Sequence, residues 1–240
     1  MKIKELIIYG DSTSLPRPND SVESKDTWYW KLLEFSKFQF SLENRSAGGI
    51  AIRSLRLKIL NDAHYLFPKG NISNKNKMVI LSTGVVDAGI HPITYKLKIV
   101  NKLPIIGIYL WFFLAKVLKP SRAKIQRMWG YSITSPKKFA KELDQIVTFL
   151  RERNVEVCLL LTPIPHVALD VRSPGFRQNV IKYNVIKEEL CKKFSNVNLV
   201  SLDNFKESYY VSEQDGHHFS KLGHSYIFNR IKSEVNFESL

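Results

Sequence analysis

Two short motifs near opposite ends of the sequence contain residue types that could carry out covalent chemistry. Gly10-Asp11-Ser12 follows the first apolar run, and Asp215-Gly216-His217-His218 lies near the C-terminus. A serine hydroxyl is a weak nucleophile until a base takes its proton during attack. A neutral imidazole can take that proton near pH 7, and a carboxylate can orient the imidazole. The two motifs therefore supply a candidate nucleophile, base and orienting carboxylate.

Apolar periodicity predicts alternating strands and helices around these motifs. We expect strands at 4–9, 38–42, 78–82, 155–162 and 197–202, and helices at 27–37, 50–62, 135–153, 178–194 and 220–234. This alternation predicts an α/β fold, a three-layer α/β/α sandwich with a parallel sheet of about five strands. Sites in such sheets form at the carboxyl ends of the strands. The two motifs and the turn Gly84-Val85-Val86-Asp87 should therefore meet at one edge of the sheet.

Composition sets the broad class. The chain has 240 residues, 44% of them apolar and 24% charged, which is typical of a globular protein. We expect one domain over residues 1–240, with an insertion at about 90–131 that shapes the site edge.

Cys158 and Cys191 give neither a disulfide framework nor a metal-binding spacing, so we expect both in the core. The N-terminal residues lose apolar character too early for a signal peptide, which predicts a cytoplasmic location.

The two motifs resemble those of the SGNH, or GDSL, hydrolase superfamily. Gly10-Asp11-Ser12 matches its first block, Gly49 (or its neighbour Gly48) falls at the glycine of the second, and Asp215 with His218 matches the last. The resemblance extends over nearly the whole chain in the right order. It implies Ser12 as nucleophile, His218 as base and Asp215 as orienting carboxylate, with the N–H groups of Ser12 and Gly49 as the oxyanion hole. This chemistry requires no metal or organic cofactor.

The third block departs from the family pattern. Its usual Gly-x-Asn-Asp reads Gly84-Val85-Val86-Asp87 here, so Val86 stands where an asparagine normally donates to the oxyanion. Loss of one such donor typically costs about 100- to 1000-fold in rate. Asn44, Ser46 and His91 are candidates for a replacement donor.

Other polar residues near the motifs have open roles. Asp11, Asn44, Asp87 and His217 are candidates for substrate contact, although Asp87 could instead cap a helix. His217 is the alternative base. Clustered His and Asp side chains could also bind a metal, but no further Cys or His pattern supports a metal site.

Charge is concentrated in one window. The formal net charge is +14, and residues 88–141 contain eleven Lys or Arg and no Asp or Glu. Within this window, residues 103–115 carry no charge but are too few for a transmembrane helix, which needs about 20. We expect either a buried helix or oligomer contact, or an interfacial element that holds the protein on an anionic membrane surface through the Lys96–Lys141 window. No nucleic-acid-binding module is recognisable, so nucleic acid is the weaker anionic partner.

Three functional hypotheses follow. The Gly-Val-Val-Asp variant resembles SGNH proteins associated with bacterial surface-polysaccharide synthesis, which implies an ester on a glycan as substrate. The first hypothesis is a serine esterase that removes acyl or acetyl groups from a carbohydrate or an acylated small molecule. The second is a polysaccharide O-acetyltransferase with the same triad. The third is a catalytically degenerate SGNH domain that binds a glycan or a partner protein. The sequence does not set the oligomeric state.

Overall fold

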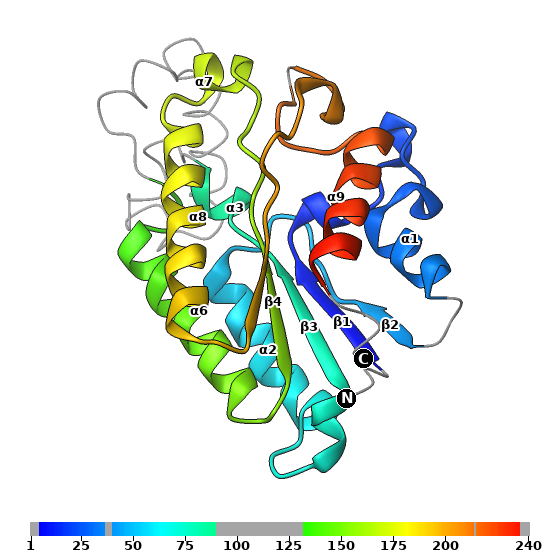
Figure 1. Cartoon of the computed structure of the whole chain (residues 1–240). Coiled ribbons are helices and arrows are strands. Elements are labelled where there is room, and N and C mark those ends of the chain that lie inside the picture. Colours follow the sequence, from blue (N-terminus) through cyan, green and yellow to red (C-terminus); the bar gives the residue numbers. More distant parts are fainter. Residues whose placement is uncertain (1–4, 37–39, 90–131, 214, 236–240) are drawn as a thin grey trace, which may run out of the picture.

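The computed structural model describes residues 5–36, 40–89, 132–213 and 215–235. Five strands form one parallel sheet in the order β2-β1-β3-β4-β5. They are β1 (Glu5–Gly10), β2 (Ser41–Asn44), β3 (Lys77–Ser82), β4 (Glu156–Leu160) and β5 (Val197–Val200). The described helices of eight or more residues are α1 (Trp28–Phe35), α2 (Ile52–Leu66), α6 (Pro136–Arg151), α8 (Phe176–Lys193) and α9 (Lys221–Glu234). The expected three-layer α/β/α fold is confirmed (Figure 1).

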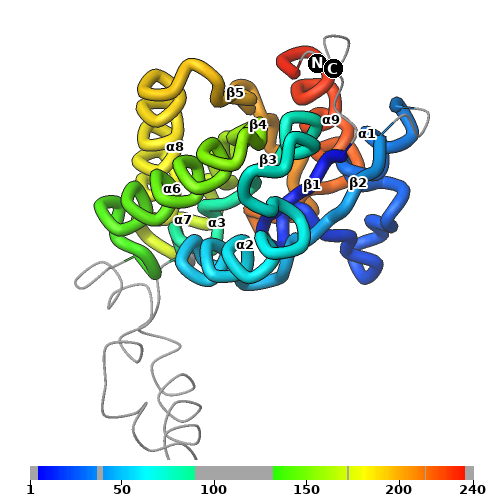
Figure 2. The backbone as a smooth tube through the Cα atoms, turned by 90° about the horizontal axis from the view of Figure 1, so that it is seen from below, coloured from blue at the N-terminus to red at the C-terminus, as the bar shows by residue number. Residues whose placement is uncertain are grey.

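Helices cover both faces of the sheet. Helices α2, α6 and α8 lie on one face, and α1 and α9 lie on the other (Figure 2). The three inner strands are almost wholly apolar because side chains of a buried parallel strand point alternately into two cores. On β1, Ile7 and Tyr9 enter the first core, whereas Leu6 and Ile8 enter the second. The expected core position of Cys158 is confirmed, and Cys191 is half-buried on α8.

The second strand begins and ends later than expected. The sequence predicts it at 38–42, but it comprises Ser41–Asn44 and pairs with β1 through Ile8 and Asn44. Its side chains alternate between exposed and half-buried, because β2 lies at the edge of the sheet. The pairing with β1, rather than the apolar run before it, sets its position. Asn44 is therefore the last residue of the strand and not part of the loop that follows.

The insertion at about 90–131, His91 and the apolar stretch 103–115 lie outside the described residues. Three lysines of the basic window, Lys137, Lys138 and Lys141, lie in the first two turns of α6 and are exposed. Within the described part of the chain, no helix is both long enough and apolar enough to cross a membrane.

Gly10 allows β1 to end in a tight turn. A Cβ at Gly10 would lie 2.7 Å from Ser14 Oγ and 2.8 Å from the carbonyl oxygen of Ser82. That carbonyl also accepts a hydrogen bond from the Asp11 N–H at 3.1 Å. A larger residue at position 10 would thus push the Asp11–Ser12 segment away from β3.

We predict that Gly10→Ala destabilises the protein by about 1–3 kcal/mol, because the added methyl group overlaps the Ser82 carbonyl oxygen, a backbone atom that cannot move independently. Gly48→Ala is the matched control, since a Cβ there meets nothing within 4 Å, and we expect a change within about 0.5 kcal/mol. Urea unfolding of both variants measures the difference. Equal stability of the two variants would contradict this account of the turn.

Candidate active site

The nucleophile turn follows β1 directly. Asp11 is extended and its carboxylate Oδ1 accepts hydrogen bonds from the Thr13 N–H at 3.0 Å and the Thr13 hydroxyl at 2.6 Å. This Asx-type cap starts the 3₁₀ turn η1 (Ser12–Ser14). Ser12 is the first residue of that turn, so it lies at the carboxyl edge of the sheet.

The histidine loop follows β5 and folds back toward the same edge. Asp215 Oδ1 accepts hydrogen bonds from the N–H groups of His218 at 2.7 Å and His217 at 3.3 Å. Gly216 has a φ of +64°, a left-handed conformation that favours glycine. Its carbonyl accepts a hydrogen bond from the His166 N–H at 3.0 Å, and this contact ties the loop to the segment after β4. The loop is thus held on both sides before it reaches Ser12.

The side chains of Ser12, His218 and Asp215 form a continuous chain. Ser12 Oγ lies 2.9 Å from His218 Nε2. His218 Nδ1 lies 2.9 Å and 2.8 Å from the two oxygens of Asp215. In this arrangement the Nδ1–H donates to the carboxylate and leaves Nε2 as the acceptor for the serine proton. The structure brings together the three residues that the two motifs predict.

Local charges keep Asp215 ionised. Burial alone would raise its pKa, but the hydrogen bond from His218 and the nearby imidazoles outweigh burial and hold the pKa of Asp215 well below its ordinary range. Arg17 adds a positive charge, with its Nη2 3.8 Å from Asp215 Oδ2. The Asp215 carboxylate is therefore ionised near neutral pH, where its negative charge can stabilise a protonated His218.

His217 packs beside the triad. Its ring centre lies 4.1 Å from that of His218, and its Nδ1 lies 2.6 Å from the Asp215 carbonyl oxygen. Burial lowers its pKa, which favours the neutral ring. Ligand atoms of Asp215, His217 and His218 all lie within 4.8 Å of one another, a spacing that could hold a metal ion. However, both ring nitrogens of His218 already have protein partners, so the geometry is explained by activation of a hydroxyl group.

Two of the candidate substrate contacts have structural roles instead. Asp87 is fully buried, and its carboxylate accepts hydrogen bonds from the Ile52 N–H at 3.0 Å and the Thr134 hydroxyl at 2.5 Å. It caps α2 from another part of the chain, which corrects the expectation of substrate contact. Asp11 is also fully buried, and it shapes the nucleophile turn rather than facing the solvent. In both cases the burial of the carboxylate leaves no surface for a substrate.

The loop after β2 carries Gly49, the second expected oxyanion donor. The Ala47 N–H donates to the Gly10 carbonyl at 3.0 Å, so this loop is fixed to the end of β1. Gly49 lies in its exposed turn with a φ of +70°. The N–H groups of Ser12 and Gly49 donate to no protein acceptor in the described ranges, which leaves them available to a ligand.

Two of the three candidate replacement donors for Val86, Asn44 and Ser46, lie against the nucleophile turn. Asn44 is half-buried, its Nδ2 donates to the Ser14 carbonyl at 3.3 Å, and its Oδ1 accepts from the Ser46 N–H at 3.1 Å. Asn44 therefore braces the nucleophile turn, and its contact with a substrate stays a prediction. The Ser46 hydroxyl is buried behind Gly10. The third candidate, His91, is outside the described residues, so the backbone N–H groups of Ser12 and Gly49 stay the predicted oxyanion donors.

Sequence reasoning did not identify Lys187, which lies beneath the site. This lysine of α8 is fully buried, and its Nζ donates to the carbonyls of Thr83 at 2.6 Å and Leu160 at 2.8 Å. It thereby joins the carboxyl ends of β3 and β4. Burial lowers its pKa to about 7, although the nearby carboxylates of Asp11 and Asp87 oppose that change. Burial likewise raises the pKa of Asp87 to about 6.

Comparison with solved structures supports the fold. Similar structures include an acetyl xylan esterase, AlAXEase, at 17% identity and a TM-score of 0.61, with 97% of this chain and 100% of that chain covered. A G-D-S-L-family lipolytic protein from Veillonella parvula has 13% identity and a TM-score of 0.60, with 96% and 97% covered. A lipase/acylhydrolase from Enterococcus faecalis has 14% identity and a TM-score of 0.57, with 98% of each chain covered.

Likeness at this level of identity establishes a shared fold. The chain has the fold of the G-D-S-L lipolytic proteins, also called SGNH hydrolases, and the resemblance seen in the motifs is confirmed at that level. No family model matches the sequence, and no curated protein matches it.

We predict that Lys187 makes stability depend on pH. Between pH 7 and its ordinary pKa of 10.5 the unfolded chain binds a proton on Lys187 that the folded chain does not. The free energy of unfolding should therefore rise with pH across this window, and below pH 7 the lysine contributes no further change. In Lys187→Met this part of the rise should disappear, as measured by urea unfolding at pH 7, 8 and 9.

Lys182→Met, which removes an exposed lysine from the same helix, is the matched control and should keep the rise. The same pH dependence in Lys187→Met and wild type would show that Lys187 is protonated to the same extent in the folded and unfolded states.

Proposed function

We propose that this protein is an SGNH-type serine esterase that cleaves acyl esters, most simply acetyl esters, of a carbohydrate. The observation that carries the proposal is the chain of contacts from Asp215 through His218 to Ser12, at 2.8 Å and 2.9 Å. These distances are those of a formed hydrogen-bond relay. The residues come from loops at opposite ends of the sequence, and a purely structural role for the three together has no support in their packing.

The reaction would proceed through an acyl-enzyme. Ser12 Oγ attacks the acyl carbonyl carbon while its proton passes to His218 Nε2. The oxyanion that forms accepts hydrogen bonds from the N–H groups of Ser12 and Gly49. When the intermediate collapses, His218 gives its proton to the departing sugar oxygen, which leaves as a hydroxyl group, and the acyl group stays on Ser12.

Water completes the cycle by the same route. His218 takes a proton from water, the resulting hydroxide attacks the acyl carbon, and the carboxylic acid leaves as Ser12 regains its proton. Asp215 remains ionised throughout and stabilises the imidazolium. A sugar hydroxyl in place of water would make the same residues an O-acetyltransferase.

The carbohydrate part of the proposal rests on two supports. The Gly-Val-Val-Asp turn resembles that of SGNH proteins linked to surface polysaccharides, and one structural neighbour is an acetyl xylan esterase. A peripheral position on an anionic membrane, through the Lys96–Lys141 window, would bring the site close to lipid-linked glycans. Ester cleavage by Ser12 and His218 does not itself require a position at the membrane.

The test is the release of acetate from xylose tetraacetate and from p-nitrophenyl acetate. We expect wild type to hydrolyse both esters and Ser12→Ala to lose about 10³-fold or more of either activity. Hydrolysis of the p-nitrophenyl ester alone would contradict the carbohydrate assignment. Absence of both activities would contradict the esterase.

Added methyl β-D-glucopyranoside separates hydrolysis from transfer in the same assay. Free acetate as the main product supports the esterase. Acetate found mainly on the added glucoside would instead identify an acyltransferase.

A further inference from the structure

A second crevice opens at the carboxyl edge of the sheet, between β4 and β5. The chain leaves β4 toward α8 on one face of the sheet and leaves β5 toward α9 on the other (Figure 1). Neighbouring parallel strands whose connections go to opposite faces leave a gap, and such gaps are where ligands bind in open α/β sheets. The triad occupies one such position beside β1. The β4–β5 gap is another.

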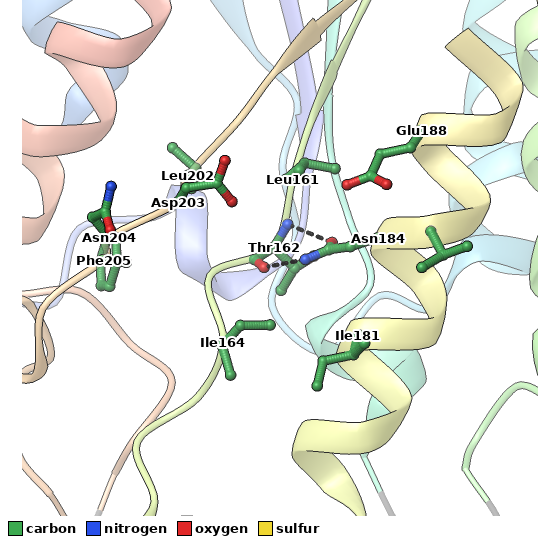
Figure 3. A pocket seen from close by; sticks show the side chains of 11 residues that line it. Leu161, Thr162, Ile164, Ile181, Asn184, Glu188, Leu202, Asp203, Asn204 and Phe205 are labelled. Carbon is green, nitrogen blue, oxygen red and sulfur yellow. Dashed lines mark hydrogen bonds between the residues drawn. The ribbon is translucent and has the colours of Figure 1, made fainter. Parts of the chain in front are cut away.

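The walls of this gap are fixed without a ligand. The last ladder contact joins the Leu161 N–H to the Val200 carbonyl at 2.9 Å. Beyond it the two chains separate, and Asn204 turns the β5 chain away with a φ of +63°. The side chain of Asn184 on α8 then pairs with Thr162, accepting from its N–H at 2.9 Å and donating to its carbonyl at 2.7 Å. The backbone N–H and carbonyl of Thr162, just beyond the end of β4, are therefore both paired by the Asn184 side chain (Figure 3).

The crevice has room for a small molecule. Its volume is about 470 Å³, within the usual range for ligand sites. One wall is a face of α8 and the other is the segment 202–205 after β5. Leu161 and Thr162 line both this crevice and the small cavity beside Asp11 and Thr13, so the chain after β4 lies between the crevice and the nucleophile turn.

The lining combines apolar surface with hydrogen-bond acceptors. Ile181 and Val185 on α8 are 39% and 44% exposed, so the described residues leave their apolar surface open. Glu188 from the helix and Asp203 from the opposite segment both border the space (Figure 3). None of the described lining residues is cationic, although the chain as a whole carries +14.

This lining selects the chemistry of the ligand. Carboxylates repel anions and accept hydrogen bonds from hydroxyl groups strongly. A bare metal ion is disfavoured, since the two acidic residues stand on opposite walls with apolar side chains between them. A pyranose ring matches both parts of the lining. Its hydroxyl groups can donate to the carboxylates, and its apolar C–H faces can pack against the apolar side chains.

We infer that the crevice between β4 and β5 is a saccharide-binding site for a neutral pyranose unit, separate from Ser12. The choice of a saccharide rests in part on the proposed function, which has a carbohydrate ester as its substrate. Binding itself needs no triad. It can therefore be measured in the Ser12→Ala variant, which lacks the nucleophile.

The experiment is saturation-transfer NMR of Ser12→Ala with methyl β-D-xylopyranoside and methyl β-D-glucopyranoside. Methyl β-D-glucuronide serves as the anionic probe and n-butylammonium as the cationic one. We expect saturation of the neutral pyranosides and none of the glucuronide. Binding of butylammonium in place of the pyranosides, or no binding of either pyranoside, would overturn the inference.

Two substitutions in the Ser12→Ala background locate the site. Glu188→Ala should raise the Kd of the bound pyranoside about tenfold, the effect of one hydrogen bond to a charged group. Val185→Trp should fill the crevice and abolish binding. Glu189→Ala is the matched control, because Glu189 is acidic and adjacent but does not line the crevice.

An unchanged Kd in Glu188→Ala and Val185→Trp would place the saccharide elsewhere and overturn the inference. Because ester hydrolysis by wild type is measured separately, loss of this site and loss of the esterase are distinguishable results.

Discussion

The contact between Ser12 and His218 joins parts of the chain that are 206 residues apart. It depends on the parallel sheet, because the ends of β1 and β5 both point to the same edge, and the loops that follow them can converge only there. The rest of the site is built around this contact. Asp11 fixes the turn that presents Ser12, and Asp215 both fixes the loop backbone and orients the imidazole. This one hydrogen bond thus depends on how the sheet orders β1 and β5.

Three ionisable side chains are buried beneath the site, where the ends of β1, β3 and β4 lie side by side. Lys187, Asp87 and Asp11 are all fully buried. A buried ionic group destabilises the fold unless it is paired or well hydrogen-bonded. Lys187 and Asp87 each have several protein partners, whereas Asp11 accepts hydrogen bonds through Oδ1 and its buried Oδ2 has no hydrogen-bond partner among the described residues. Lys187 donates hydrogen bonds to backbone carbonyls at the ends of β3 and β4. Asp87 accepts a hydrogen bond from the backbone N–H of Ile52 at the start of α2. These contacts hold the edge of the sheet that carries Ser12 and His218.

Sequence reasoning reached the triad but not its support. Ser12, Asp215 and His218 could be predicted, since each lies in a short motif and the order of strands and helices places both motifs at one edge. Lys187 could not, because a lysine flanked by Ile186 and Glu188 on an amphipathic helix is typical of a solvated surface. Asn184 could not be predicted either, because a polar residue on the same helix is equally typical of a solvated surface. Asp87 was open between two roles, and only the position of Ile52 and Thr134, both distant in sequence, decides for the cap.

Edge elements were the least predictable part of the fold. The inner strands are apolar on both sides and were found within one or two residues, whereas β2 has few apolar positions and its register is set by β1. The crevice between β4 and β5 has no sequence signature, because its walls come from three separate segments. Its existence follows from where two neighbouring chains diverge, which only the structure shows.

The most direct test of the central claim, that His218 activates Ser12, is the intact mass after incubation with a fluorophosphonate. The account predicts a single adduct on wild type and none on Ser12→Ala, because only an activated serine reacts with this probe. Unmodified wild-type protein, or an adduct that persists in Ser12→Ala, would contradict it.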